Sequence, residues 1–292
     1  MLFGVGATKA GTSWLHDHLS AHPECHFRSI KELHYFDTVQ HDRFNGALRN
    51  AKAEVARLSD RLLSAAGAKL AHLTQRVADL NDWIAVLTLK TLDWAAYRGY
   101  LTRGAGARRL VGDVTPAYAL LPEARLRDMA GFAPDVRFVY LMRDPVARFW
   151  SHVRMLARRG APEAQYAQAA GALFDRITGG DTSGEAGGLL ARGDYRAALE
   201  KLDRAVDPAR LLVMFQEELM TIPGLARLSA FLGIADTGAD FDRRVHEGLP
   251  LPLTVAQRTR AQTFLRPQYD YAATRFPALP DAWRRNMGEG VA

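Results

Sequence analysis

The chain has 292 residues, 48% of them hydrophobic and 24% charged, and a formal net charge of +6. This composition is typical of globular proteins and excludes the disordered and fibrous classes. The single cysteine, Cys25, cannot form an intrachain disulfide, and no cysteine cluster indicates a zinc site. No run of about 18 apolar residues predicts a membrane span.

The amino-terminal residues 1–6 lead directly into a glycine-rich stretch, without the charged and apolar regions of a secretory signal. We therefore expect a cytoplasmic enzyme. The positive charge favours anionic partners in general. It is diffuse and forms no basic stripe, so we expect no nucleic-acid partner.

A glycine-rich turn follows the strand predicted over residues 2–6 and precedes a helix predicted from Thr12 onward. Such a turn exposes backbone N–H groups that bind phosphate with the help of the helix dipole. Lys9 adds a positive charge, and Thr12 and Ser13 add hydroxyl donors. An ATP-binding P-loop has its lysine directly after the last glycine. Here Thr12 follows Gly11, and the lysine lies two residues before that glycine.

Residues 31–37 form a second polar segment with candidate acid–base groups. Alternation along an extended segment would place Glu32, His34 and Phe36 on one side. A carboxylate and an imidazole on one face could share a proton path. Taken alone, the segment is more simply explained by a surface salt bridge between Lys31 and Glu32 beside a core histidine.

Residues 45–105 are predicted to be helical, because apolar residues recur there at steps of three and four. The stripe comprises Leu58, Leu62, Ala66, Leu70, Leu73, Val77, Leu80, Ile84 and Leu87. Three interpretations stay open. The segment packs on its own domain, forms a dimerising coiled coil, or is a helical insertion on the substrate side.

Later apolar runs predict strands over residues 109–113, 136–142 and 211–215, with helical segments between them. Strands that alternate with helices indicate an α/β domain with a parallel sheet. Residues 158–193 are rich in glycine and alanine with scattered charge, and we interpret them as a mobile loop or cap.

Arg143 lies at the carboxyl end of the strand predicted over 136–142, where α/β sheets bind ligands. Ser151 follows eight residues later, about two helical turns on. A strand-end arginine and a helix hydroxyl can converge on one phosphate, and the planar guanidinium suits this role. Asp144 is expected to cap the helix. Arg148 fits either ligand contact or a surface ion pair.

Two of these segments resemble the nucleotide-binding motifs of the sulfotransferase family. Lys9-Ala10-Gly11-Thr12-Ser13-Trp14-Leu15 resembles the 5′-phosphosulfate loop, and Arg143-Asp144-Pro145-Val146-Ala147-Arg148-Phe149-Trp150-Ser151 resembles the 3′-phosphate motif. The resemblance implies that the co-substrate is 3′-phosphoadenosine 5′-phosphosulfate (PAPS), with no metal. The residues that it assigns to PAPS are Lys9, Ala10, Gly11, Thr12, Ser13, Trp14, Arg143, Ser151 and Tyr195.

Residues 31–37 resemble Lys-Glu-x-His-x-Phe-Asp of the carbohydrate sulfotransferases related to the heparan sulfate enzymes. The resemblance implies that Glu32 is the catalytic base, that His34 assists it, and that Lys9 stabilises the leaving phosphate. His34 is the competing base, because some small-molecule sulfotransferases use histidine. Asp113 and Val114 replace the glutamate and lysine of a related family stretch, which makes a glycan acceptor less secure.

The resemblance implies one sulfotransferase domain over residues 1–292, with a P-loop-like central parallel sheet flanked by helices and a helical insertion at about 45–105. The implied reaction is in-line transfer of a sulfuryl group to a hydroxyl or amine. Two alternatives are an ATP-dependent kinase with an altered P-loop and a noncatalytic nucleotide- or lipid-binding protein. The acceptor stays open among carbohydrates, lipid headgroups and small metabolites, as does a homodimer through the helical segment.

Overall fold

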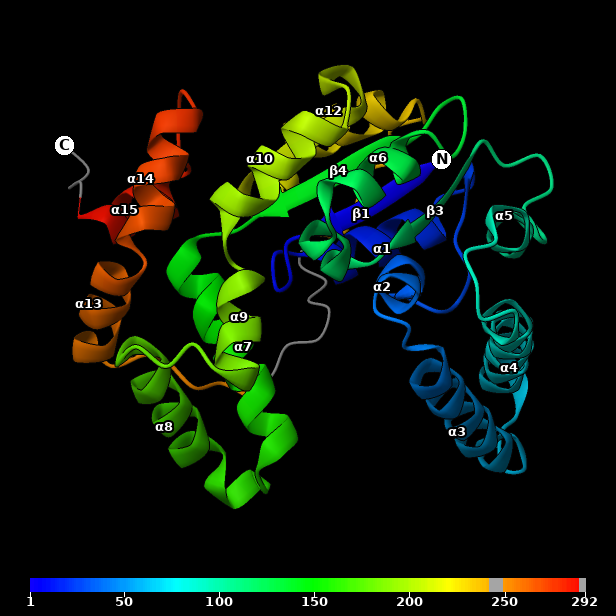
Figure 1. The fold of residues 1–292 in the computed structure, drawn as a ribbon, viewed down its shortest axis with the longest axis horizontal. Helices are drawn as coiled ribbons and strands as arrows, with labels where there is room; N and C mark the ends of the chain where they lie inside the picture. Colours follow the sequence, from blue (N-terminus) through cyan, green and yellow to red (C-terminus); the bar gives the residue numbers. More distant parts are fainter. Residues whose placement is uncertain (242–248, 289–292) are drawn as a thin grey trace.

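The centre of the molecule is a five-stranded sheet in which every pairing is parallel, in the order β2-β3-β1-β4-β5 (Figure 1). The computed structural model describes residues 1–241 and 249–288. Its strands are β1 (Leu2–Gly6), β2 (Cys25–His26), β3 (Leu110–Val114), β4 (Arg137–Met142) and β5 (Leu211–Phe215). The predicted α/β class is confirmed. The two-residue strand β2 was not predicted, because so short a segment produces no periodic pattern.

The central strands β1 and β4 are apolar because both faces of the sheet are covered. Every residue of β1 is buried, and β4 is buried from Phe138 onward. Leu2 pairs with Gly112 of β3 on one side and with Arg137 of β4 on the other. Since the strands run in one direction, the loops that follow β1, β3, β4 and β5 emerge at the same edge of the sheet.

Helices connect and flank the strands. They are α1 (Thr12–Ala21), α2 (Tyr35–Gln40), α3 (Phe44–Leu62), α4 (Gly67–Thr88), α5 (Trp94–Thr102), α6 (Glu123–Ala130), α7 (Pro145–Gly160), α8 (Tyr166–Thr178), α9 (Gly184–Ala191), α10 (Tyr195–Ala205), α11 (Gln216–Leu219), α12 (Ile222–Leu232), α13 (Val255–Phe264), α14 (Arg266–Arg275) and α15 (Asp281–Met287), with short 3₁₀ turns at η1 (Pro116–Leu120), η2 (Glu163–Gln165) and η3 (Pro208–Arg210). Within the described ranges, no helix is long and apolar enough to cross a membrane.

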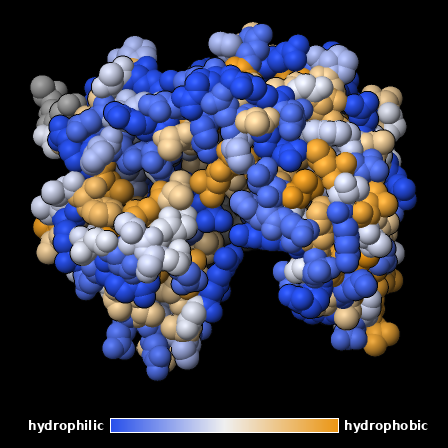
Figure 2. Space-filling model, viewed as in Figure 1, coloured by the Kyte–Doolittle hydropathy of each residue, from blue (hydrophilic) through white to orange (hydrophobic). Residues whose placement is uncertain are grey.

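Two groups of helices project from one side of the sheet, α7–α9 at the lower left and α3–α4 at the lower right of Figure 1. The space-filling view in the same orientation shows the surface hollowed between them (Figure 2). The sheet edge that carries the loops after β1 and β4 faces this hollow. The fold therefore places a recess where α/β sheets bind their ligands.

The segment 45–105 is helical as predicted, but it forms the separate helices α3, α4 and α5. The chain turns between Leu62 and Gly67, and α3 packs on α4 as a helical hairpin. The apolar stripe is therefore interrupted, with Leu58 and Leu73 buried but Leu70 40% exposed. A homodimer through this segment stays a prediction.

Residues 158–193 differ from the predicted loop, because α8 and α9 occupy most of them. Alanine is the best helix former, and α8 is rich in it. One face of α8 buries Ala170, Phe174 and Ile177, and α9 buries Ala186 and Leu189. Packing of these faces offsets the cost of the glycines, a contribution that composition alone does not show.

A buried ion pair attaches α4 to the segment that leads from β2 to Glu32. Arg28 Nη2 lies 2.9 Å from Asp79 Oδ1 and 2.6 Å from Asp82 Oδ2. The second carboxylate oxygen of Asp79 accepts from the Ser29 N–H at 2.7 Å. The side chains of Arg28 and Asp79 are 4% and 2% exposed, so solvent screens this pair little.

Replacement Asp79→Ala would leave the buried Arg28 guanidinium with Asp82 as its remaining carboxylate partner. We expect the free energy of unfolding to fall by about 2–4 kcal/mol, because a buried charge and the Ser29 amide lose their partner. Urea denaturation measures this change. The more exposed Asp82 provides the matched control, and Asp82→Ala should cost less. An equal or smaller loss in Asp79→Ala would contradict the anchoring role.

Candidate active site

A cavity of about 1430 Å³ opens at the carboxyl edge of the sheet, in the hollow of Figure 2. Its walls come from the β1–α1 loop, the segment before α2, η1, α7, α9 and the start of α11. The lining includes nine of the predicted site residues: Lys9, Gly11, Thr12, Ser13, Trp14, Glu32, His34, Arg143 and Ser151. Two of the predicted residues, Ala10 and Tyr195, do not line it.

The β1–α1 loop presents the amino end of α1 to the cavity. Gly11 precedes the helix with φ 92°, in the left-handed region that favours glycine. The first helical hydrogen bond runs from the Leu15 N–H to the Gly11 carbonyl at 3.1 Å. The amides of Thr12, Ser13 and Trp14 therefore lack intrahelical acceptors and can donate to an anion.

The position of Ala10 does not fit the predicted contact with the nucleotide. Its side chain is fully buried. Its N–H donates to the Ala7 carbonyl at 3.1 Å, within the turn itself. Ala10 therefore shapes the loop and offers the cavity no donor, whereas the side chain of Lys9 lines the cavity directly.

The two predicted anion-binding loops meet at a hydrogen bond. Arg143 Nη1, from the loop after β4, donates to the Lys9 carbonyl at 3.3 Å. Both side chains line the same cavity. Lys9 and Arg143 lie 134 positions apart in the sequence, and the parallel pairing of β1 with β4 brings them together.

Tyr195 lies behind Arg143, and it is buried. Its hydroxyl donates to the Arg143 carbonyl and accepts from the Arg143 N–H. The sequence predicted a nucleotide contact for Tyr195, but the structure gives it a different position. It fixes the backbone of the strand-end arginine, so its effect on a ligand would act through Arg143.

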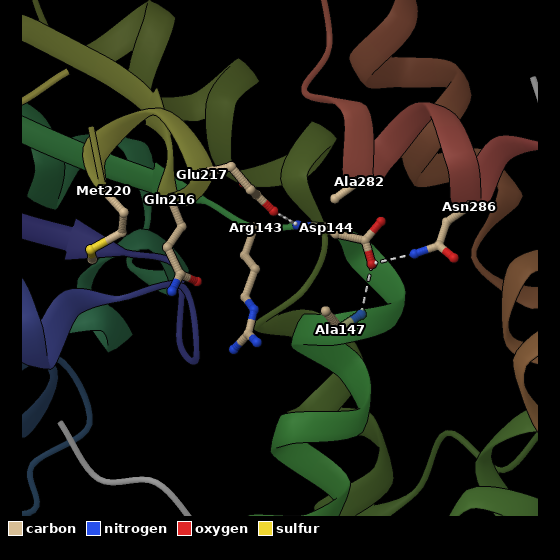
Figure 3. Close-up of a pocket in the computed structure, with 8 residues that line it drawn as sticks. All are labelled: Arg143, Asp144, Ala147, Gln216, Glu217, Met220, Ala282 and Asn286. Carbon is tan, nitrogen blue, oxygen red and sulfur yellow. Dashed lines mark hydrogen bonds between the residues drawn. The ribbon is translucent and has the colours of Figure 1, made fainter. Parts of the chain in front are cut away.

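Acidic groups next to Arg143 hold the start of α7, as Figure 3 shows. Asp144 caps the helix as predicted, accepting from the Ala147 N–H at 2.8 Å and from Asn286 Nδ2 at 2.9 Å. Glu217 Oε1 accepts from the Asp144 N–H at 3.1 Å. The Arg143 side chain extends away from both carboxylates, and it lines the cavity. Its guanidinium is therefore available to a ligand.

Ser151 and Arg148, the remaining polar positions of the α7 motif, lie differently. Ser151 lines the cavity. Arg148 is 2% exposed, and its Nη1 lies 3.4 Å from His152 Nδ1, so it is neither a surface ion pair nor a lining residue. Burial, with the positive charge of Arg148 nearby, lowers the pKa of His152 to about 2. His152 therefore faces the cavity as a neutral imidazole.

Glu32 and His34 both line the cavity, but the segment is not extended as predicted. Their φ values of 61° and 53° are left-handed, and Phe36 is buried in the core instead of sharing their side. His34 Nδ1 lies 2.8 Å from Asp37 Oδ2, and its Nε2 lies 3.6 Å from Glu32 Oε2. Lys31 Nζ forms an ion pair with Glu32 Oε1.

These contacts determine the charges of Glu32 and His34. Burial disfavours the charged imidazole, but the carboxylates of Asp37 and Glu32 outweigh it and raise the pKa of His34 to about 10. Burial likewise opposes ionisation of Glu32, but His34 and Lys31 lower its pKa to about 2. The two side chains are 42% and 40% exposed, so solvent screens part of this attraction. At neutral pH the direction of both shifts favours a carboxylate beside an imidazolium.

Asp113, which replaces a glutamate of the family stretch, does not line the cavity. It is buried, and it accepts from the hydroxyls of Tyr97, Thr115 and Tyr118 at 2.8, 2.7 and 2.6 Å. Burial raises the pKa of this carboxyl. The Tyr118 hydroxyl also accepts from the Tyr35 N–H at 3.0 Å. Asp113 therefore supports the segment that carries His34.

Two parts of the lining were not identified from the sequence. The first is an aromatic position, Phe241, whose ring lies 6.2 Å from that of Trp14 at an interplanar angle of 13°. Trp14 also stacks on His18 at 5.0 Å. The second is a set of four arginines: Arg154, Arg158, Arg159 and Arg192. Arg154, Arg158 and Arg159 follow Ser151 by three, seven and eight residues, and this helical spacing could have indicated from the sequence that they share a face with it.

The described residues hold no group of three or more histidine, cysteine, aspartate or glutamate side chains placed for a metal ion. A model of the sulfotransferase family matches residues 2–237. No curated protein sequence matches the chain.

Two solved structures illustrate the similarity of this fold to those of known sulfotransferases. A sulfotransferase from Alicyclobacillus acidocaldarius is similar over 97% of this chain and 98% of that chain, with a TM-score of 0.62 and 20% identity. A sulfotransferase domain from the curacin biosynthetic pathway is similar over 92% and 96%, with a TM-score of 0.50 and 17% identity. At these identities the likeness shows the fold alone.

The family match includes both strand-end loops, the Glu32–His34 segment and β5. The finer similarity to carbohydrate sulfotransferases stays a prediction. Because the family model matches most of the chain, the chain belongs to the sulfotransferase family.

Proposed function

We propose that this chain transfers a sulfuryl group from PAPS to a hydroxyl or amine acceptor by in-line displacement. The observation that carries the proposal is the contact of the two loops, in which Arg143 donates to the Lys9 carbonyl while both side chains line one cavity. Two adjacent anion sites fit a nucleotide that carries charged groups on both its 3′ and 5′ oxygens. A cytoplasmic location stays a prediction.

The donor would be held at three places. The amides of Thr12 and Ser13, at the amino end of α1, suit the 5′-phosphosulfate together with Lys9. Arg143 and Ser151 suit the 3′-phosphate. The neighbouring aromatic rings of Trp14 and Phe241 offer stacking surfaces for adenine.

The chemical step moves the sulfuryl group from the bridging phosphate oxygen to the acceptor atom. The bond between the sulfuryl sulfur and the bridging phosphate oxygen breaks, and a bond from sulfur to the acceptor oxygen or nitrogen forms. Charge accumulates on the leaving phosphate, where the Lys9 ammonium would stabilise it. Burial and then the charge of Arg143 lower the pKa of Lys9. Burial strengthens the attraction between its ammonium and an added anion, and Arg143 contributes a second positive charge beside it. Positioning and electrostatics account for such a rate enhancement.

The acceptor proton would go to Glu32. An ionised carboxylate can take a proton, whereas an imidazole with a carboxylate at each ring nitrogen is already protonated. His34 is therefore assigned as the group that holds Glu32 in place, and not as the base. Lys31 holds the other carboxylate oxygen of Glu32.

The donor class can be tested by ligand-induced stabilisation. We expect 3′,5′-adenosine bisphosphate at about 100 times its dissociation constant to raise the melting temperature by about 5 °C. AMP lacks the 3′-phosphate and should give a much smaller shift. Selective stabilisation by ATP with magnesium would favour the kinase alternative instead. Binding of the bisphosphate without transfer to any acceptor would favour a noncatalytic protein.

Lys9→Ala should lower kcat by about 100- to 1,000-fold, because one preplaced charge at the leaving group is lost. Lys69, exposed on α4, provides the matched control. Lys69→Ala removes the same charge and should leave kcat unchanged. Transfer of ³⁵S from labelled PAPS measures both rates. An unchanged kcat in Lys9→Ala, with the fold intact, refutes the assigned role.

The charge state of His34 predicts a pH dependence. Its pKa is raised from the ordinary 6.5 to about 10, so its interaction stabilises the fold fully below pH 6.5 and is lost as the pH rises through about 10. We expect ¹⁵N NMR to show a protonated ring at pH 8. Glu32→Gln removes one carboxylate and should move the titration midpoint towards 6.5. A midpoint near 6.5 in the unaltered protein would show that no imidazolium forms.

A further inference from the structure

Four arginines on one wall of the cavity are not used by the donor site described above. Arg154, Arg158 and Arg159 belong to α7, and Arg192 directly follows α9. All four line the cavity. Glu185 of α9 is the carboxylate on the same wall, so positive charge is in excess there.

These arginines lack carboxylate partners among residues 1–241 and 249–288, whereas many arginines elsewhere have them. Arg154 and Arg192 donate to backbone carbonyls, those of Leu249 and Gly188. On the outer surface, by contrast, ion pairs are frequent: Arg57 with Glu54, Arg204 with Glu123, Arg266 with Asp270 and Arg275 with Asp203. The cavity wall thus keeps guanidinium groups whose charge is not neutralised by a described carboxylate.

Two of these arginines, Arg154 and Arg159, act electrostatically on Lys9. Burial lowers the pKa of Lys9, and the charges of Arg143, Arg154 and Arg159 lower it further. The carboxylate of Glu32 is already engaged by Lys31 and His34. An anion that entered this part of the cavity would be attracted by positive charge that the carboxylates among the described residues do not fully offset.

The 3′-phosphate does not account for the outer arginines. Arg158 and Arg159 follow Ser151 by seven and eight residues, which is about 11 Å along the helix axis. Arg143 lies just before α7 and Ser151 in its first half, so a phosphate that they bind lies about two helical turns before the backbone of Arg158 and Arg159. Met155 and Leu156 lie between Ser151 and Arg158 on α7, and they line the cavity together with Tyr166 and Leu189.

We propose that the acceptor carries, besides its reacting hydroxyl or amine, an anionic group on an apolar body, and that Arg158 and Arg159 bind this group. The anion is a carboxylate, phosphate or sulfate, and the apolar body lies along the α7–α9 wall while the reacting hydroxyl or amine reaches Glu32. The concave cavity suits a small molecule. This inference rests on the proposed sulfotransferase reaction, because it assigns the acceptor of that same site.

Matched pairs of phenolic probes test the inference. Phloretate and its amide differ by a carboxylate, and tyrosol phosphate, esterified at the alkyl oxygen, differs from tyrosol by a phosphate. Calorimetry measures the affinity of each probe for the protein saturated with 3′,5′-adenosine bisphosphate. We expect at least one anionic probe to bind about tenfold or more tightly than its neutral partner. The two pairs distinguish carboxylate from phosphate recognition.

The double variant Arg158→Ala/Arg159→Ala should reduce this preference to less than about twofold and leave the affinity for the bisphosphate unchanged. Arg57→Ala/Arg61→Ala removes the same charge from α3, away from the cavity lining, and should keep the preference. High salt should weaken the preference in the unaltered protein, because the arginines are partly exposed.

Several results would overturn the inference while the sulfotransferase proposal stands. The first is equal affinity within both probe pairs, which includes no measurable binding of any probe. The second is a preference for the anionic probe that survives in Arg158→Ala/Arg159→Ala. The third is a preference that is lost equally in the α3 control. Loss of bisphosphate affinity in Arg158→Ala/Arg159→Ala would assign these arginines to the donor. Failure of the unaltered protein to bind the bisphosphate would overturn both proposals, so the two failures are distinguishable.

Discussion

The parallel pairing of β1 with β4 is the constraint on which the site depends. It delivers two loops, far apart in sequence, to one edge of the sheet, where Arg143 donates to the Lys9 carbonyl. Without this adjacency, each loop would be an isolated anion site at a strand end. With it, the strand ends that carry the two loops lie one strand spacing apart, about 4.8 Å.

Buried polar contacts beneath the cavity hold the second half of the site. Asp113 accepts from Tyr118, whose hydroxyl accepts from the Tyr35 amide next to His34. Asp79 holds the Ser29 amide a few residues earlier. The Glu32–His34 segment thus keeps its left-handed backbone between two buried anchors. This support explains how a short irregular segment can present an ion pair to a ligand in a defined geometry.

The sequence predicted the sheet and the two loops well, because each has a local cause. An apolar run marks β4, and glycine with lysine and hydroxyls marks the turn before α1. The left-handed conformation of Glu32 and His34 was not predictable, since it depends on contacts with distant Tyr118. The helices α8 and α9 were missed for a related reason, because burial of their faces, and not composition, decides their structure.

Side-chain pairing was also beyond the sequence. The chain has 38 lysine and arginine residues, and only the structure separates those that face a carboxylate from those that face the cavity. Tyr195 illustrates the same limit, since the family resemblance implied a nucleotide contact while its position behind Arg143 depends on how α10 packs.

The glycine content of α9 has a consequence for the range of molecules that this cavity can admit. Gly184 and Gly188 both line it without side chains, and a Cβ at Gly188 would come within 3.3 Å of the Arg192 guanidinium and nothing else. The recess could therefore be narrowed at position 188 of α9, a helix that contributes no residue to the proposed donor site. Laboratory evolution that seeks new acceptors could vary α9 and the last turn of α7 and keep the group-transfer chemistry intact.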